Sequence, residues 1–249
     1  MTYRYGMVVM LCLTLVIAGC WDHSFADQFL DDPKGRKYYE QRGEIIWEKP
    51  MKKKWIALTF DDGPHPMVTS EILSILKQYH AKATFFCMGA KVKLRPHIVK
   101  RMISEGHEIG NHTYHHKKLQ RLSSQSIQKE MDLSQQITMK TTGRRPVLFR
   151  PPEGYYNADI IKLAKKNRQQ VILWSWDQDT KDWRNPSVSF IVNKVTKNAS
   201  NGDIVLFHDT QMVTVRALKR IIPILKKEGY QFVTVSQLIQ GVTGKSVTH

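Results

Sequence analysis

The stretch Thr59-Phe60-Asp61-Asp62-Gly63-Pro64 holds two adjacent carboxylates at the end of an apolar segment. The segment from Trp55 to Phe60 predicts a buried β-strand, and Gly-Pro directly after it predicts a sharp turn. Because side chains alternate along a strand, Asp61 and Asp62 need not point the same way. They can therefore have different roles, such as metal ligand and proton acceptor. An isolated Asp-Asp-Gly is more often a solvated turn, so residues elsewhere in the chain must decide.

Short apolar segments alternate with amphipathic segments along the rest of the chain. Further strands are predicted over residues 83–88, 147–150, 171–176, 204–208 and 231–235, and another strand ends near residue 110. Helices are predicted over residues 67–79, 98–104, 124–139, 158–166, 188–197 and 215–227. This alternation predicts an α/β fold, a barrel of about seven mainly parallel strands with outer helices. In such barrels the functional site lies at the C-terminal ends of the strands.

The N-terminal residues indicate export. The apolar segment from Met7 to Gly19 is too short to cross a bilayer as a mature helix, but it fits the apolar region of a secretory signal. Ile17-Ala18-Gly19-Cys20 resembles a bacterial lipoprotein signal, in which lipidated Cys20 anchors the protein to the outer face of the membrane. An ordinary cleaved signal with secretion, or a short uncleaved anchor, is the alternative. We expect a signal over residues 1–20, a tether over 21–50 and one folded domain over 51–245.

Composition fits one globular domain, since 41% of the 249 residues are hydrophobic and 24% are charged. The formal net charge of +16 favours an anionic partner for an exported protein, such as acidic wall polymers or a membrane surface. The sequence carries no helix-turn-helix, zinc-finger or RNA-binding motif, so we expect no nucleic-acid partner. Cys87 stands alone once Cys20 is modified and the signal is removed, which leaves no intramolecular disulfide.

A histidine-rich segment, Gly110-Asn111-His112-Thr113-Tyr114-His115-His116, follows one predicted strand. The i, i+4 spacing of His112 and His116 places two imidazoles on one side of a helical turn. Two His and one carboxylate form a common site for a divalent metal, with positions left open for water and substrate. Either Asp61 or Asp62 would supply the oxygen, and His115 is an alternative to His116.

Three further strand ends carry polar residues. In Phe149-Arg150-Pro151-Pro152-Glu153-Gly154, the two prolines stiffen the backbone that displays Arg150, and a guanidinium beside an Asp keeps that Asp ionised and oriented. His208, at the tip of the strand over residues 204–208, could donate a proton if a carboxylate raises its pKa. Asp182, within the segment from Trp176 to Trp183, could be that carboxylate. Trp183 and Leu206 could wall a small apolar pocket.

These five motifs, in this order, resemble the polysaccharide deacetylase family with the NodB-type domain, which is carbohydrate esterase family 4. The resemblance covers roughly residues 54 to 240. Each motif alone is modest evidence, whereas five in sequence, each at a strand end, form a specific signal. The resemblance implies that the folded domain is a deformed (β/α) barrel and a catalytic domain that removes acetyl groups from N-acetylated sugar polymers.

The resemblance also implies how the metal and the base are arranged. Asp61 would be the general base, oriented by Arg150. Asp62 would bind the metal together with His112 and His116. We expect one divalent ion, Zn²⁺ in the first place and Co²⁺, Mn²⁺ or Ni²⁺ as alternatives. Such an ion makes bound water more acidic and polarises a carbonyl group, which amide hydrolysis requires.

The remaining roles follow from the same resemblance. His208 would be the general acid, with its pKa tuned by Asp182. The backbone N–H of Glu153 would stabilise the oxyanion, and many relatives have Tyr or another residue at this position. Trp183 and Leu206 would form the pocket for the acetyl methyl group.

We therefore expect a monomeric, metal-dependent N-deacetylase outside the cell, acting on GlcNAc or MurNAc of peptidoglycan. An O-acetyl esterase acting on xylan-type polymers would use the same residues. A non-catalytic sugar-binding lipoprotein on the same fold would have lost the base, the acid or a metal ligand, and all of these are present. A phosphate-handling metalloenzyme would need a second metal cluster, which the sequence does not show.

Overall fold

The computed structural model describes residues 34–243. The expected signal peptide, the lipidation of Cys20 and residues 21–33 of the expected tether lie outside this range. Between residues 34 and 243, no helix is both long and apolar enough to span a membrane.

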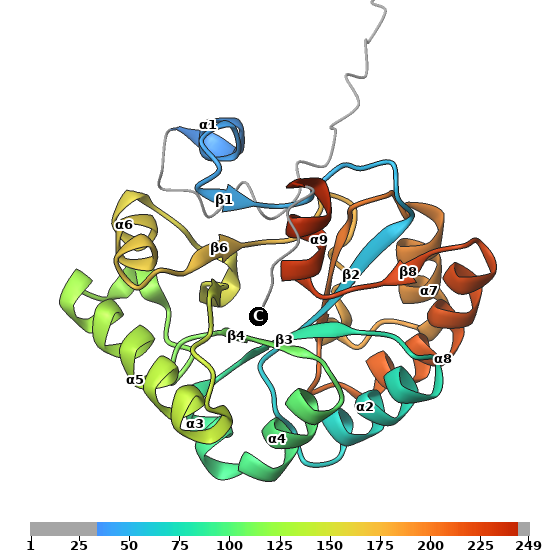
Figure 1. The fold of residues 1–249 in the computed structure, drawn as a ribbon, viewed down its shortest axis with the longest axis horizontal. Coiled ribbons are helices and arrows are strands. Elements are labelled where there is room, and N and C mark those ends of the chain that lie inside the picture. The colour runs from blue at the N-terminus through green and yellow to red at the C-terminus, as the bar shows by residue number, and fades with distance from the viewer. Residues whose placement is uncertain (1–33, 244–249) are drawn as a thin grey trace, which may run out of the picture.

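The strands form a single sheet that curls into a barrel, with helices on the outside (Figure 1). Their order is β1-β6-β5-β4-β3-β2-β7, and β8 pairs with the start of β2. All of these pairs are parallel, which confirms the expected barrel of parallel strands. The strands are β1 (Ile45–Ile46), β2 (Trp55–Asp61), β3 (Ala83–Cys87), β4 (Glu108–Asn111), β5 (Leu148–Phe149), β6 (Gln170–Ile172), β7 (Ile204–His208) and β8 (Gln231–Phe232).

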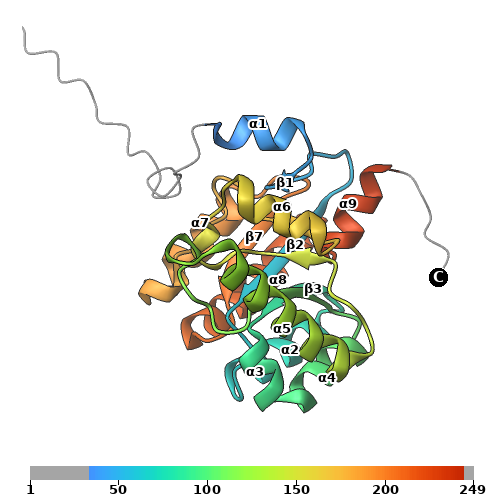
Figure 2. The same ribbon diagram turned by 90° about the vertical axis from the view of Figure 1, so that its left-hand side faces the viewer.

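Helices cover the outer face of the sheet in both views (Figures 1 and 2). Three short 3₁₀ turns lie near the C-terminal ends of strands: η2 (Leu119–Arg121), η3 (Pro152–Gly154) and η4 (Asp182–Arg184). The helices are α1 (Gly35–Gln41), α2 (Val68–Gln78), α3 (Gly89–Leu94), α4 (Pro96–Ser104), α5 (Ser124–Thr142), α6 (Ala158–Lys166), α7 (Val188–Lys197), α8 (Met212–Lys227) and α9 (Val235–Thr243).

Strand β2 lies between β3 and β7 and sets their register. Phe60 pairs with Phe85 on one side and with Phe207 on the other. The Phe60 ring stacks on both partners, with centroid distances of 5.0 and 5.6 Å, and all three side chains are fully buried. Offset stacking of buried rings adds to the free energy gained from burial alone. The same register places Asp61 directly opposite His208 at the C-terminal end of the sheet.

Strand β6 ends at Ile172, earlier than the predicted strand over residues 171–176. The following segment changes its hydrogen-bonding partner. The backbone N–H of Leu173 donates to the carbonyl of Ile46 in β1, whereas that of Ser175 donates to the carbonyl of Ile204 in β7. The chain therefore crosses from one edge of the sheet to the other at this point and brings the two edges together.

The prediction of a tether over residues 21–50 is wrong for residues 34–50. Helix α1 and strand β1 pack on the barrel, and β1 extends the sheet beside β6 (Figure 1). Tyr39, Ile45 and Trp47 are 2%, 1% and 7% exposed. The rings of Tyr39 and Trp47 both meet Tyr156 edge-on, at 5.5 and 5.7 Å. These apolar residues are spaced among charged ones without a strand or helix period, which concealed the element in the sequence.

Helices α3 and α9 were not predicted. Helix α3 has six residues and begins at Gly89, directly after β3. Helix α9 is fixed by a distant carboxylate, because Glu108 in β4 accepts hydrogen bonds from the backbone N–H and the hydroxyl of Ser236. Both helices depend on contacts that a local sequence pattern does not show.

If residues 34–50 belong to the core, Trp47→Ala lowers the free energy of unfolding by about 3 kcal/mol or more, because it leaves a cavity among aromatic rings. Urea unfolding followed by circular dichroism measures this loss. Lys37→Ala on the exposed side of α1 is the control, and a surface change of this kind stays within about 0.5 kcal/mol. Equal stability of the two variants would restore the tether interpretation.

Candidate active site

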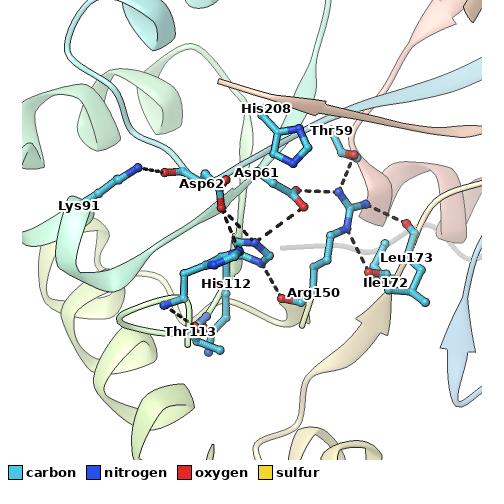
Figure 3. Close-up of polar contacts among 12 residues, drawn as sticks. Thr59, Asp61, Asp62, Lys91, His112, Thr113, Arg150, Ile172, Leu173 and His208 are labelled. Atoms are coloured by element: carbon cyan, nitrogen blue, oxygen red, sulfur yellow. Dashed lines mark hydrogen bonds and ion pairs between the residues drawn. The ribbon is translucent and has the colours of Figure 1, made fainter. Parts of the chain in front are cut away.

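Polar side chains from several strands meet at the C-terminal end of the barrel. The donors and acceptors come from the ends of β2, β4, β5 and β7, as the sequence predicted (Figure 3). Parallel strands carry their C-terminal ends to the same edge, so motifs far apart in the chain become neighbours.

Arg150 is a buried cation, and each of its three side-chain nitrogens has an acceptor. Its side chain is 0% exposed, and Nη1 donates to Asp61 Oδ1 at 2.7 Å and to Thr59 Oγ1 at 2.8 Å. Nη2 and Nε donate to the carbonyls of Leu173 and Ile172 at 2.8 and 3.2 Å. Burial lowers the pKa of Arg150, and the Asp61 carboxylate opposes that effect. The guanidinium therefore holds one oxygen of Asp61 in a fixed position.

Asp62 points away from Arg150 and toward two imidazoles (Figure 3). Its Oδ1 lies 3.4 Å from His112 Nε2 and 3.3 Å from His116 Nε2. Burial opposes ionisation of Asp62, but the imidazoles hold its pKa far below the ordinary value. Asp61 Oδ2 is farther from His112 Nε2, at 3.9 Å. The structure thus gives the two adjacent Asp residues different neighbours.

The group Asp62, His112 and His116 fits a divalent cation. Their ligand atoms lie within 4.8 Å of one another, and Asp62 Oδ1 is buried without a hydrogen-bond partner. Ligand atoms about 2.1 Å from a tetrahedral zinc ion lie roughly 3.4 Å apart, close to the two separations found here. His112 Nδ1 lies 2.7 Å from the carbonyl of Arg150, a contact that fixes the ring and leaves Nε2 free to bind.

Several residues of the site have left-handed backbone conformations. The φ angles are 73° at Asp62, 61° at Thr113, 58° at His116 and 58° at Glu153. Each such residue costs on the order of 1–3 kcal/mol and persists only where its surroundings hold it. At Asp62 the stabilising contacts include one from Lys91, whose Nζ donates to the Asp62 carbonyl at 2.7 Å. Strain at these positions is typical of a functional site.

His208 and Asp182 form a hydrogen-bonded pair, as expected from the sequence. His208 Nδ1 lies 2.7 Å from Asp182 Oδ1, and the His208 backbone N–H donates to Asp182 Oδ2 at 2.8 Å. Thr214 Oγ1 also donates to that oxygen, at 2.5 Å. Burial alone would lower the pKa of His208, but Asp182 outweighs it and raises the pKa to about 9. The Asp182 carboxylate therefore favours the protonated imidazole at neutral pH.

The remaining predicted residues within the described range differ in burial. Glu153 lies in η3, and its exposed side chain contacts Lys118 Nζ at 3.4 Å. The predicted role of Glu153 involves its backbone N–H, which this side-chain contact does not occupy. Leu206 is buried in β7, whereas Trp183 in η4 is 52% exposed. Turn η4 packs against β7, but the acetyl pocket formed by Trp183 and Leu206 stays a prediction.

Sequence reasoning missed Asp209 and Thr69. Asp209 is fully buried behind the Asp62–Gly63 turn, and a Cβ atom at Gly63 would collide with its carboxylate. Thr69 Oγ1 donates to Asp209 Oδ2 at 2.5 Å, and burial raises the pKa of Asp209 to about 7. The position of Asp209 directly after His208 was the available signal. Thr69 lies within a predicted helix and offered none.

Comparisons with known proteins agree with this geometry. The model of the family described as polysaccharide deacetylase matches residues 48–172. A peptidoglycan-N-acetylglucosamine deacetylase of Bacillus cereus is 48% identical over 208 residues, covering 82% of this chain and 97% of that protein. The peptidoglycan-N-acetylmuramic acid deacetylase PdaC of Bacillus subtilis is 41% identical over 221 residues, covering 85% of this chain. The matched part is 46% of PdaC, so the chain spans about half of that relative's length.

Solved structures give the same result. The Bc1960 peptidoglycan N-acetylglucosamine deacetylase superposes with a TM-score of 0.79 at 35% identity, covering 83% of this chain and 97% of that one. A CE4 family pseudoenzyme from Bacillus anthracis gives a TM-score of 0.73 at 30% identity, covering 78% of this chain and 68% of that one. Since the family model matches half of the chain and the Bacillus cereus relative is matched over nearly its full length, the chain belongs to the polysaccharide deacetylase family.

Proposed function

We propose that the protein is a metal-dependent hydrolase that removes N-acetyl groups from peptidoglycan GlcNAc or MurNAc and releases acetate. The observation that carries this proposal is the separation of the two adjacent carboxylates. Asp61 is bound to Arg150 at 2.7 Å, while Asp62 faces His112 and His116. One carboxylate is thereby available to move a proton and the other to bind a cation.

Asp62, His112 and His116 would hold the metal. When bound, a divalent cation there would make the attacking water more acidic and polarise the acetyl carbonyl. Zn²⁺ is the ion we propose, because two imidazoles and one carboxylate with an open position are typical of catalytic zinc sites. Co²⁺, Mn²⁺ and Ni²⁺ are alternatives that the same ligands accept.

Asp61 and His208 would carry out the two proton transfers of the reaction. Arg150 holds Asp61 Oδ1, so Oδ2, which lies 3.9 Å from His112 Nε2, faces the proposed metal site and can take a proton from water. His208, kept protonated by Asp182, can give a proton to the departing sugar amine. Each positioned proton transfer accelerates such a reaction by roughly 10²–10⁴-fold.

The oxyanion would be stabilised by a backbone N–H. In the proposed arrangement Glu153 presents its amide from the left-handed turn after Arg150-Pro151-Pro152. A donor from the main chain is preorganised, since it costs no reorganisation when charge develops. Trp183 and Leu206 would enclose the acetyl methyl group.

The substrate and location are proposed from the relatives and from the N-terminal sequence. The three deacetylases named above are described as acting on peptidoglycan, which supports a wall glycan as the substrate. The lipoprotein-type signal ending at Cys20 and the net charge of +16 fit a monomer anchored outside the cell beside an anionic wall or membrane.

Purified peptidoglycan incubated with the zinc-loaded protein should release acetate and yield free amines on GlcNAc or MurNAc. Acetate assay and mass spectrometry of muropeptides measure both products. Removal of metal with a chelator should abolish release, and added Zn²⁺ should restore it. Absence of acetate with every divalent metal tested would refute the proposal.

Asp61→Asn should lower kcat by about 10²-fold or more, because the amide oxygen still accepts from Arg150 but cannot take a proton. Asn keeps a hydrogen-bond acceptor for Arg150 but removes the negative charge beside the buried guanidinium, so the variant should be less stable, and circular dichroism must verify that it is folded. Zinc affinity should stay close to wild type, because Asp61 is not among the proposed ligands. Wild-type turnover in this variant would exclude Asp61 as the base.

The alkaline limb of kcat/KM should depend on Asp182. The active form of His208 is protonated, and its pKa of about 9 means that activity is lost as pH rises toward that value. A bound cation would repel the imidazolium, so the wild-type limb should lie at or below pH 9. Asp182→Asn removes the charge that raises this pKa while burial still lowers it, so the limb should move acidward by about 1 unit or more. An unchanged limb would contradict the role of His208.

A further inference from the structure

The two proposed histidine ligands are joined by a tight loop over residues 112–116. Thr113 and His116 have φ angles of 61° and 58°. Such conformations are unfavourable for residues other than Gly and persist only where neighbouring groups hold the chain. The one internal side-chain bond that the described loop shows is from the His116 N–H to Thr113 Oγ1, at 3.1 Å. Groups outside the loop must therefore supply most of the contacts that stabilise these backbone conformations.

Helix α5 supplies the side-chain part of this support through Glu130. The Glu130 residue is 5% exposed, yet each of its oxygens has a partner in the loop. Oε2 accepts from the His115 backbone N–H at 2.8 Å, and Oε1 lies 2.8 Å from His115 Nδ1. Lys117 Nζ lies 3.5 Å from Oε1. Burial opposes ionisation, but the hydrogen bonds from His115 keep the pKa of Glu130 below its ordinary value.

The same helix holds the start of the loop. Asn111 Nδ2 donates to the Met131 carbonyl at 3.0 Å, and Asn111 Oδ1 accepts from the Thr113 N–H at 2.9 Å. Consecutive residues of α5, Glu130 and Met131, therefore bind the loop on both sides of its first left-handed residue. The segment between the two proposed ligands is thus bound by α5 and also by the start of α3, where the backbone N–H groups of Gly89 and Ala90 donate to the carbonyls of Thr113 and Tyr114 at 2.9 and 3.0 Å.

These contacts decide which imidazole reaches Asp62. His115 is turned toward α5, and its side chain remains 49% exposed. His116, one residue later, places Nε2 3.3 Å from Asp62 Oδ1. From the sequence, His115 and His116 were both candidates for the second nitrogen ligand. The contact with Glu130 engages both the ring and the backbone of His115, which leaves His116 facing the site.

We infer that Glu130 is a positioning residue of the metal site, which binds His115 and thereby fixes His116 toward Asp62. The inference rests on the proposed metal centre. Glu130 does not contact the proposed ligand atoms, so it acts through the loop backbone. Loss of a residue that orients metal ligands from outside the coordination shell typically weakens metal binding by roughly 10–100-fold.

Zinc affinity, measured by competition with a chromophoric chelator, tests this inference without reference to activity. The full-length protein is compared with Glu130→Ala, Glu130→Gln and Asp132→Ala. Asp132 is the matched control, because it is a carboxylate on the same helix that accepts from Gln128 at 2.7 Å and Asn167 at 3.1 Å and does not bind the loop. Circular dichroism and thermal unfolding of the zinc-free proteins report folding.

Glu130→Ala should bind zinc roughly 10–100-fold more weakly than wild type, and Asp132→Ala should bind as wild type does. Glu130→Gln keeps an oxygen for the His115 N–H and should lie between them. Equal zinc affinity of folded Glu130→Ala and wild type would overturn the inference and leave the metal centre intact. If Glu130→Ala does not fold, the zinc affinity of Glu130→Gln is compared with that of Asp132→Ala. Equal affinities of these two variants would then overturn the inference. A wild-type protein that binds no zinc would instead refute the metal centre itself.

Discussion

The buried ion pair between Arg150 and Asp61 is the interaction on which the site depends. A guanidinium inside the barrel is tolerated because each of its three nitrogens has an acceptor, from Asp61, Thr59 and two backbone carbonyls of the β6 segment. Breaking one side of such a pair costs about 3–5 kcal/mol, since it leaves a buried charge without compensation. The pair therefore links three strand ends: β2 carries Asp61 and Thr59, β5 precedes Arg150, and the carbonyl acceptors lie at the end of β6 and in the residue after it.

This pair also separates the two adjacent carboxylates. Asp61 is the last residue of β2 and turns to Arg150, whereas Asp62 is left-handed and turns to the imidazoles. The strain at Asp62 is held by Lys91 and by the close packing of Gly63 on Asp209. The loop of His112 and His116 is strained in the same way and is held by α5. Supports from neighbouring helices thus keep the functional backbone in conformations that it would not adopt alone.

Much of this arrangement could be predicted from the sequence, because the motifs occur at strand ends and parallel strands bring those ends together. The strand-end rule allowed Asp182 to be proposed as the partner of His208, whereas the pairing of Arg150 with Asp61 was implied by the resemblance to the deacetylase family. Residues that act from helices could not be predicted in this way. Glu130 is one of two acids on a polar helix, and only the folded chain shows that it faces the histidine loop. Trp47 was missed for the related reason that its partners, such as Tyr156, are distant in sequence.

The central claim is that Asp62 binds the metal while Asp61, held by Arg150, remains off it. Anomalous diffraction at the zinc edge from crystals of the zinc-loaded protein tests this most directly. The account predicts one zinc peak within bonding distance, about 2.0–2.2 Å, of Asp62, His112 and His116. Asp61 should remain bound to Arg150 with neither oxygen coordinating the ion. A peak coordinated by Asp61, by His115 in place of His116, or located elsewhere on the protein would contradict it.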